Sequence, residues 1–196
     1  MRDGWRGSKR SVLKAMILSV ATVLLGVPLA AQTGSGSNWK AILADRIPLF
    51  GHRNWIVVAD SAYPVQAANG IETVVSNADH FDVLQAVLRA LDRSKHVKPI
   101  VHLDQELQFV NDSDASGISA YREQLAALIG DRPIKREAHE QIISQLAQVS
   151  QSFRVLIIKT NLTLPYTSVF LQLDCAYWNE DAEQRLRSSL NEQPAK

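Results

Sequence analysis

Residues 51–64 read GHRNWIVVADSAYP, and the predicted fold follows from this stretch. Its centre, Trp55 to Ala59, is a short apolar run with an isoleucine and two valines, which is typical of a buried β-strand. His52 precedes the run and Asp60 closes it. Pro64 lacks an amide hydrogen, so the chain turns after the strand. Open α/β sheets bind ligands at the ends of such strands, and we therefore expect a site near Asp60.

The first 31 residues have the layout of a secretory signal peptide. Basic residues precede an apolar segment over 15–31, which contains Pro28, ends in Ala30 and Ala31, and is followed by a polar linker over 32–37. Cleavage predicts a protein that is exported, either periplasmic or secreted. The alternative is an uncleaved N-terminal anchor, because an apolar run of about 17 residues is at the short limit for a spanning helix. Membrane association is expected only through this segment.

The rest of the chain has the length and charge of one ordinary domain. We expect a single domain over 38–178 and a polar tail over 179–196. Residues 1–31 hold five of the 21 Lys and Arg and one of the 20 Asp and Glu, which leaves 16 basic and 19 acidic residues. This slightly acidic balance argues against nucleic acid as a partner. The single cysteine, Cys175, is expected to be a small buried residue.

Helical and extended patterns alternate along the chain. Helical spacing predicts helices over 38–50, 79–94, 119–129 and 140–149, with either a terminal helix or a frayed end over 180–190. Apolar β-branched runs predict strands over 54–60, 71–75, 97–103, 134–137, 155–160 and 168–173. The alternation indicates an α/β fold, with a largely parallel sheet flanked by helices. Trp39, Trp55 and Phe170 are expected in its core.

Several common kinds of site are missing from the sequence. It contains no glycine-rich phosphate loop, no nucleophile elbow and no HExxH motif, and its five histidines lack paired metal-ligand spacing. These observations argue against nucleotide enzymes and metal hydrolases. We interpret His80, His96 and His102 as surface or structural residues.

Two further segments complete a pattern with residues 51–64. Ala138-His139-Glu140-Gln141 opens a predicted helix, and residues 159–168 read KTNLTLPYTS between the last two predicted strands. In this order, the three segments resemble the D-ribose pyranase / L-fucose mutarotase family over roughly residues 38–174. Ser168 departs from the pattern, because the family usually has asparagine there. Asn161 and Leu162 also stand where the pyranase branch commonly has glycine and glutamate.

The resemblance implies a sugar pocket and a cofactor-free reaction that needs no metal. His52, Asp60, His139 and Tyr166 match the catalytic residues, and Ser168, Lys159 and Tyr63 are candidate sugar-binding residues. A base would remove the anomeric hydroxyl proton while an acid protonates the ring oxygen, and ring closure reverses these roles. Histidine suits both roles because its unperturbed pKa is about 6.5. We therefore expect a monosaccharide mutarotase or pyranase-like isomerase acting on ribose, fucose or a related sugar.

Alternatives remain open for the whole protein and for its single residues. A non-catalytic sugar-binding or structural ring protein would keep the same fold. The family forms rings, commonly a decamer of stacked pentamers in which a neighbouring subunit completes the pocket, so the resemblance implies a homo-oligomer. Structural roles are also available: His52 can face a helix C-terminus, Asp60 can cap a turn, His139 can be an exposed first-turn residue and Tyr166 can pack on the core.

Overall fold

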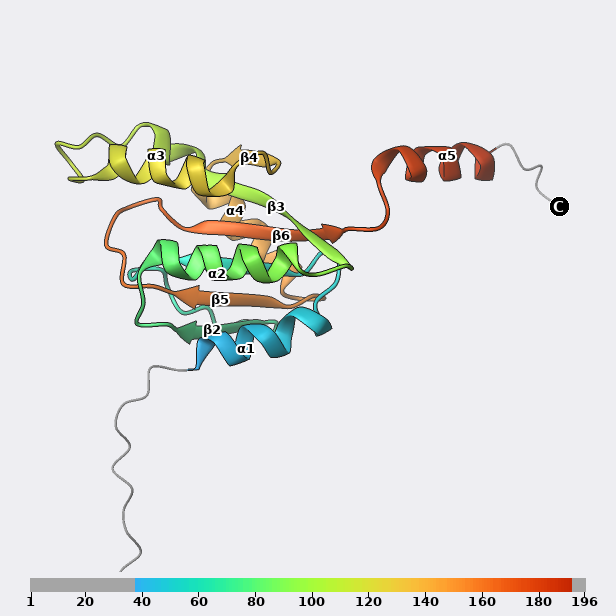
Figure 1. The fold of residues 1–196 in the computed structure, drawn as a ribbon, viewed down its shortest axis with the longest axis horizontal. Helices are drawn as coiled ribbons and strands as arrows, with labels where there is room; N and C mark the ends of the chain where they lie inside the picture. The colour runs from blue at the N-terminus through green and yellow to red at the C-terminus, as the bar shows by residue number, and fades with distance from the viewer. Residues whose placement is uncertain (1–37, 192–196) are drawn as a thin grey trace, which may run out of the picture. The chain divides into compact units, whose positions relative to one another are not determined.

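A six-stranded β-sheet lies at the centre of the computed structural model, which describes residues 38–191 (Figure 1). Its strands are β1 (Trp55–Ala59), β2 (Ile71–Val75), β3 (Val97–Asp104), β4 (Ile134–Glu137), β5 (Val155–Lys159) and β6 (Val169–Cys175). They are arranged in the order β2-β5-β1-β6-β3-β4. β6 is antiparallel to β1 and β3, and all other neighbouring pairs are parallel. The predicted α/β fold with a largely parallel sheet is confirmed.

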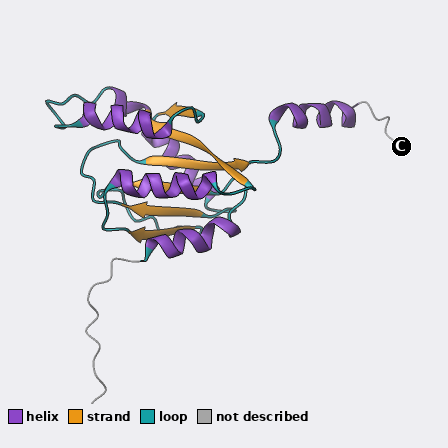
Figure 2. Ribbon diagram, in the orientation of Figure 1, coloured by secondary structure: helices purple, strands orange, loops and turns teal. Residues whose placement is uncertain are grey.

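The helices follow the predicted pattern closely (Figure 2). They are α1 (Trp39–Arg46), α2 (His80–Asp92), α3 (Ile118–Ile129), α4 (His139–Val149) and α5 (Glu180–Asn191), with short 3-10 helices η1 (Ile47–Leu49) and η2 (Gln105–Gln108). Asp79 caps α2, because its Oδ1 accepts from the amides of Phe81 and Asp82. The C-terminal segment forms α5, the helical alternative of the sequence prediction, and none of its residues is buried.

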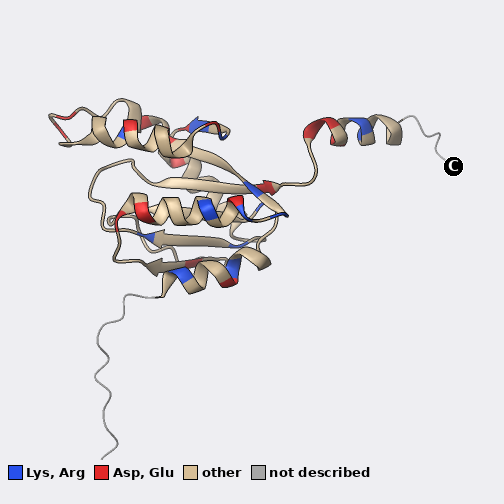
Figure 3. Ribbon diagram, in the orientation of Figure 1, with Lys and Arg blue, Asp and Glu red and all other residues tan. Residues whose placement is uncertain are grey.

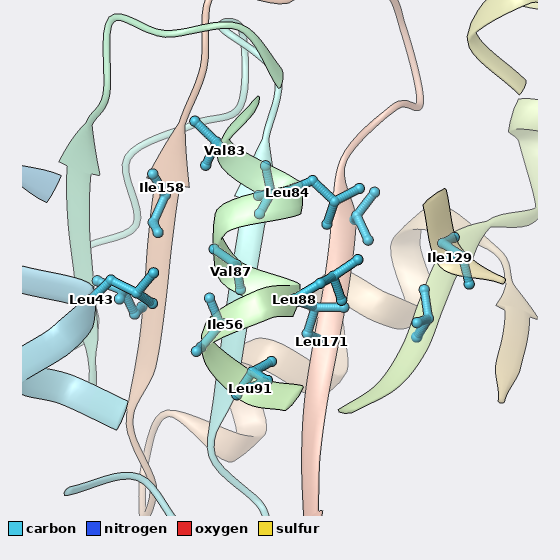
Figure 4. Close-up of a cluster of buried hydrophobic side chains, with 14 of the residues drawn as sticks. Leu43, Ile56, Val83, Leu84, Val87, Leu88, Leu91, Ile129, Ile158 and Leu171 are labelled. Atoms are coloured by element: carbon cyan, nitrogen blue, oxygen red, sulfur yellow. The ribbon is translucent and has the colours of Figure 1, made fainter. Parts of the chain in front are cut away.

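The apolar face of α2 packs on one side of the sheet. Figure 4 shows Val83, Leu84, Val87, Leu88 and Leu91 of α2 over Ile56 of β1, Ile158 of β5 and Leu171 of β6. The helical spacing of these residues places them on a single stripe, and its burial is the main contribution of α2 to stability.

The opposite side of the sheet has a second core, covered by α4. Trp55, Val57 and Phe170 are buried there with Ile142 and Leu146 of α4. Neighbouring residues of β1 point to opposite faces, so a strand that is buried on both sides is continuously apolar. Trp39, Trp55 and Phe170 are all buried, as predicted from the sequence.

The remaining sequence expectations have mixed outcomes. Cys175 is partly exposed rather than buried, because it is the last residue of β6 and pairs only with Val97 of β3, beyond the end of β1. Figure 3 shows acidic and basic residues on the same helices, as on α2, where Asp82 and Asp92 flank Arg89.

Within residues 38–191, no helix has the length and apolarity that a membrane span requires. The predicted signal peptide or anchor lies outside the described residues.

Candidate functional site

The candidate site lies where several strands meet at one edge of the sheet. Val169, the first residue of β6, pairs with Val58 of β1 and with Leu103 of β3. Ser168, one position earlier, therefore lies between the carboxyl ends of β1 and β3. Asp60 follows the first of these strands, and Asp104 is the last residue of the second. The topology thus places one carboxylate on each side of Ser168, Asp60 after β1 and Asp104 at the end of β3.

Asp60 and Ser168 are joined by two hydrogen bonds. The Ser168 hydroxyl donates to Oδ2 of Asp60 at 2.9 Å, and the Asp60 amide donates to Ser168 Oγ at 3.2 Å. Oδ1 of Asp60 accepts from the amide of Ala62 at 2.8 Å, which is the turn-capping role that the sequence left open. The carboxylate is therefore fixed at both oxygens, with lone pairs left to accept from ligand hydroxyls.

Asp104 is the most unusual group in the site. It is 1 % exposed, its Oδ2 lies 3.1 Å from Nδ1 of His139, and its Oδ1 has no hydrogen-bond partner among the described residues. Burial raises the pKa of Asp104 to about 6, and the bond to His139 opposes this rise. A carboxyl group with this pKa can both give and take a proton near neutral pH.

His139 and Tyr166 form the open side of the site. Their rings meet edge to face with centroids 5.7 Å apart, and Tyr166 is 40 % exposed. The backbone of Tyr166 is left-handed, with φ of 56°. Non-glycine residues rarely adopt this conformation, and those that do are frequently found at functional sites. Nδ1 of His139 bonds to Asp104, so Nε2 is the ring nitrogen that remains for a ligand.

Glu106 fixes the backbone of His139. Both of its carboxylate oxygens lie 3.1 Å from the His139 amide, which opens α4. Ala138, at the N-cap position, provides no side-chain hydrogen bond. Glu106 lies in the short helix η2, which directly follows β3. A carboxylate from another segment thus caps α4, and its negative charge stabilises the positive end of the helix dipole.

A second histidine–carboxylate pair lies beside the first. His102 of β3, two residues before Asp104, has Nδ1 2.5 Å from Oε2 of Glu137, two residues before His139. The other ring nitrogen lies 3.0 Å from Oε1 of Gln172, and His102 is 2 % exposed, with its ring tilted against that of Trp55. His102 is therefore a structural residue, one of the two readings that the sequence left for it, and it is buried.

The two remaining candidate sugar contacts, Lys159 and Tyr63, lie at the same end of the sheet. Lys159 pairs with Ala59, the residue before Asp60, and is partly exposed. Tyr63 is 3 % exposed, and its hydroxyl bonds to Gln66 at 3.0 Å. Burial raises the pKa of Tyr63, and the charges of Asp104 and Asp60 contribute to this rise.

His52 is separated from the other site residues within one chain. It is exposed and precedes β1, whereas Asp60 follows it. The five residues of β1 span roughly 16 Å at the usual rise of a strand. One chain therefore brings together Asp60, His139, Tyr166 and Ser168, with Lys159 at the same edge, but not His52.

Sequence reasoning missed Asp104 and Glu106. Asp104 had a usable signal, because it closes the strand over 97–103 as Asp60 closes the strand over 54–60. Glu106 had none, since its contact with His139 depends on how β3 and β4 pair. No group of three or more potential metal ligands is found among residues 38–191.

The sequence matches no family model and is similar to no curated protein at a significant level. The structure is similar to Bacillus subtilis RbsD complexed with D-ribose, at 21% identity and a TM-score of 0.49 over 70% of this chain and 92% of that one. It is also similar to the fucose mutarotase from Streptococcus pneumoniae in complex with L-fucose, at 18% identity and a TM-score of 0.48 over 72% and 97% of the two chains. FucU from Bifidobacterium longum is similar at 15% identity and a TM-score of 0.44, over 68% and 94%.

These are the two kinds of protein that the sequence motifs resemble. At such identities the likeness concerns the fold, and we infer function from the side chains of the site.

Proposed function

We propose that this protein is a cofactor-free monosaccharide isomerase that interconverts anomers, or pyranose and furanose forms, of ribose, fucose or a related sugar. The observation that carries the proposal is the pairing of buried Asp104 with His139, beside the exposed ring of Tyr166. One oxygen of Asp104 has no partner among the described residues, and the pKa of this carboxyl is raised to about 6.

The chemistry of ring opening fits this arrangement. One group must take the proton of the anomeric hydroxyl while another gives a proton to the ring oxygen, and no electrons leave the sugar. Asp104 and His139 act together as one acid/base unit, with Nε2 of His139 facing the ligand. Tyr166 is a second donor, because its ring packs edge to face on His139 at the open side of the site. His52 of a neighbouring copy is the remaining acid/base candidate.

The other polar groups suit a sugar ligand. Asp60 offers lone pairs to sugar hydroxyls while Ser168 and Ala62 hold it in place. Lys159, at the same edge of the sheet, is a further donor. Ser168 is shorter than the asparagine of the resembled family, so one direct sugar contact is replaced by the internal bond to Asp60.

The proposal includes a homo-oligomeric ring. His52 lies at the far end of β1 in its own chain, so it can serve as a catalytic residue only in the pocket of a neighbouring copy. An interface that joins two different surfaces closes into a ring when its rotation allows closure. The proposed setting is outside the cytoplasm, following the signal-peptide layout of residues 1–31.

The second candidate is a sugar-binding protein without catalysis. The observation that favours it is Ser168, which stands where the resembled family has asparagine and forms two hydrogen bonds with Asp60. Such a protein would bind the same sugars through the same carboxylate.

Exchange NMR on the purified protein separates the two candidates. Magnetisation transfer between anomeric protons of ribose, fucose, galactose and glucose reports ring opening directly, and saturation transfer reports binding. An isomerase accelerates exchange for at least one sugar, whereas a binding protein gives saturation transfer alone. Absence of both signals for every sugar would contradict both candidates.

A further inference from the structure

A closed circuit of buried hydrogen bonds lies behind the Asp60–Ser168 pair. Nδ1 of His80 lies 3.2 Å from the Thr160 hydroxyl, and Nε2 lies 3.1 Å from the hydroxyl of Tyr121. The Tyr121 hydroxyl in turn donates to the carbonyl of Thr167 at 2.7 Å. At the other end, the amide nitrogen and the hydroxyl oxygen of Thr160 each lie 2.8 Å from the carbonyl oxygen of Ala59.

Both ends of this circuit stop one residue short of the site. Ala59 immediately precedes Asp60, and Thr167 immediately precedes Ser168. Because Asp60 and Ser168 bond to one another, the circuit closes on itself through these two residues. The ends of β1 and β5 and the start of β6 are thus tied together by side chains from α2 and α3.

The circuit is almost completely shielded from water. His80 is 1 % exposed and Tyr121 is 4 % exposed, and the ring of Tyr121 packs on Phe81 with centroids 5.0 Å apart. Burial lowers the pKa of His80 to about 4, so the imidazole is neutral at neutral pH. A neutral imidazole has one donor and one acceptor nitrogen, which matches a place between two hydroxyl groups.

One protonation pattern leaves each buried group of the circuit with a hydrogen-bond partner, although the single hydroxyl hydrogen of Thr160 then serves His80 and not the carbonyl of Ala59. Tyr121 donates to Thr167, so it accepts from His80, which places the proton of His80 on Nε2. Nδ1 then accepts from the Thr160 hydroxyl. The carbonyl of Ala59 keeps the amide of Thr160 as its donor. The opposite tautomer would leave the carbonyl of Thr167 without the hydroxyl donor, which is costly for a buried group.

We propose that His80 and Tyr121 are positioning residues that hold Asp60 and Ser168 in the geometry the site requires. This inference rests on the proposed function for its catalytic consequence, but its structural consequence can be measured without a substrate. Neither residue belongs to the sugar-ring chemistry itself. Each acts through the backbone of Ala59 or Thr167.

The first test is Tyr121→Phe, which deletes one hydroxyl and keeps the ring against Phe81. The amide of Asp60 donates to Ser168 Oγ, so its hydrogen exchange reports the pair directly. We expect this exchange to accelerate roughly 5- to 10-fold, the effect of losing one hydrogen bond, while the amides of Val87 and Leu88 in α2 are unchanged. Tyr177→Phe is the matched control, because Tyr177 is 76 % exposed. An unchanged Asp60 amide in Tyr121→Phe would overturn the inference.

The second test is catalytic and includes a conservative rescue. We expect Tyr121→Phe to raise KM for ring exchange roughly 10-fold with less than a 3-fold change in kcat, since it displaces Asp60, which binds sugar hydroxyls, and leaves Asp104 and His139 in place. His80→Gln, which keeps a donor and an acceptor, should retain more activity than the similarly sized apolar His80→Leu. Equal KM in wild type, Tyr121→Phe and His80→Leu would overturn the positioning role. A wild type without ring exchange would instead overturn the proposed function, and the Asp60 amide would still decide the inference.

Discussion

Asp104 and His139 are joined by a 3.1 Å contact between Oδ2 and Nδ1, while the second oxygen of Asp104 is buried without a partner among the described residues. A buried carboxylate with an unpaired oxygen lowers the stability of the fold. Such groups are concentrated at functional sites, where they act on a ligand. The pair therefore links the stability of the fold to the chemistry of the site.

The first prediction concerns pH and stability. Burial raises the pKa of Asp104 from 3.8 to about 6. A raised folded-state pKa contributes stability below pH 3.8, and this contribution is lost as pH rises through 6. Relative to Asp104→Asn, the wild type should therefore lose about 1–3 kcal/mol of unfolding free energy between pH 4 and pH 7. Denaturant unfolding at a series of pH values measures this difference, and two parallel pH curves would contradict it.

The second prediction concerns His139 as the group that faces the ligand. His139→Gln keeps a polar group beside Asp104 but removes acid/base chemistry, so ring exchange should slow about 10²- to 10⁴-fold. Sugar affinity should change much less, as measured by saturation transfer or calorimetry. His96→Gln is a suitable control, because His96 bonds to the carbonyls of Ile47 and Phe50 away from the site. Equal rates in the two variants would rule out the assigned role.

The third prediction concerns Ser168, which is 2 % exposed and bonded twice to Asp60. Ser168→Ala leaves the Asp60 amide and Oδ2 without these bonds, so we expect a loss of about 1–3 kcal/mol in unfolding free energy and weaker sugar binding. Ser189→Ala removes a hydroxyl from the exposed surface of α5 and serves as its control. A Ser168→Ala protein with wild-type stability and affinity would show that the pair has no such function.

The fourth prediction concerns Glu106, the cap of α4. Glu106→Ala removes both acceptors from the His139 amide and should lower unfolding free energy by about 1 kcal/mol. Glu106→Gln keeps one acceptor oxygen and should lose less. Ring exchange should fall in the same order, because the position of His139 depends on this contact. An unaltered melting temperature in Glu106→Ala would be inconsistent with the capping role.

The fifth prediction concerns His52 and the proposed ring. If a neighbouring copy supplies His52, then His52→Ala and His139→Gln are each inactive alone. Subunits mixed after dissociation and reassembly should then regain part of the activity, because some pockets combine an intact His52 with an intact His139. Light scattering reports the oligomeric state in the same samples. An active monomer, or a mixture that stays inactive after reassembly, would refute the shared pocket.

The sequence predicted most of the fold because its elements are locally encoded. Residues 71–75 and 134–137 form strands as expected, and α2 lies within the expected helix over 79–94. Helical or alternating spacing within a short window is enough for these assignments.

The site was predictable only in part, since its contacts join distant segments. Asp60, His139, Tyr166 and Ser168 were proposed from three local segments that resemble the pyranase/mutarotase family. By contrast, the role of Asp104 depends on β6 lying between β1 and β3, and no local pattern reveals that order. The buried bonds of His80 and Tyr121 were missed for the same reason. Cys175 was expected to be buried because its residue type usually is, but it is the last residue of β6 and is partly exposed.

The measurement that tests the central claim most directly is the rate of anomeric exchange as a function of protein concentration, for the sugar that binds best. The account predicts a rate that rises linearly with wild-type protein and falls at least about 100-fold in Asp104→Asn, although that variant still binds the sugar. A sugar that binds the wild type without accelerated exchange, or that exchanges equally fast with Asp104→Asn, would contradict it.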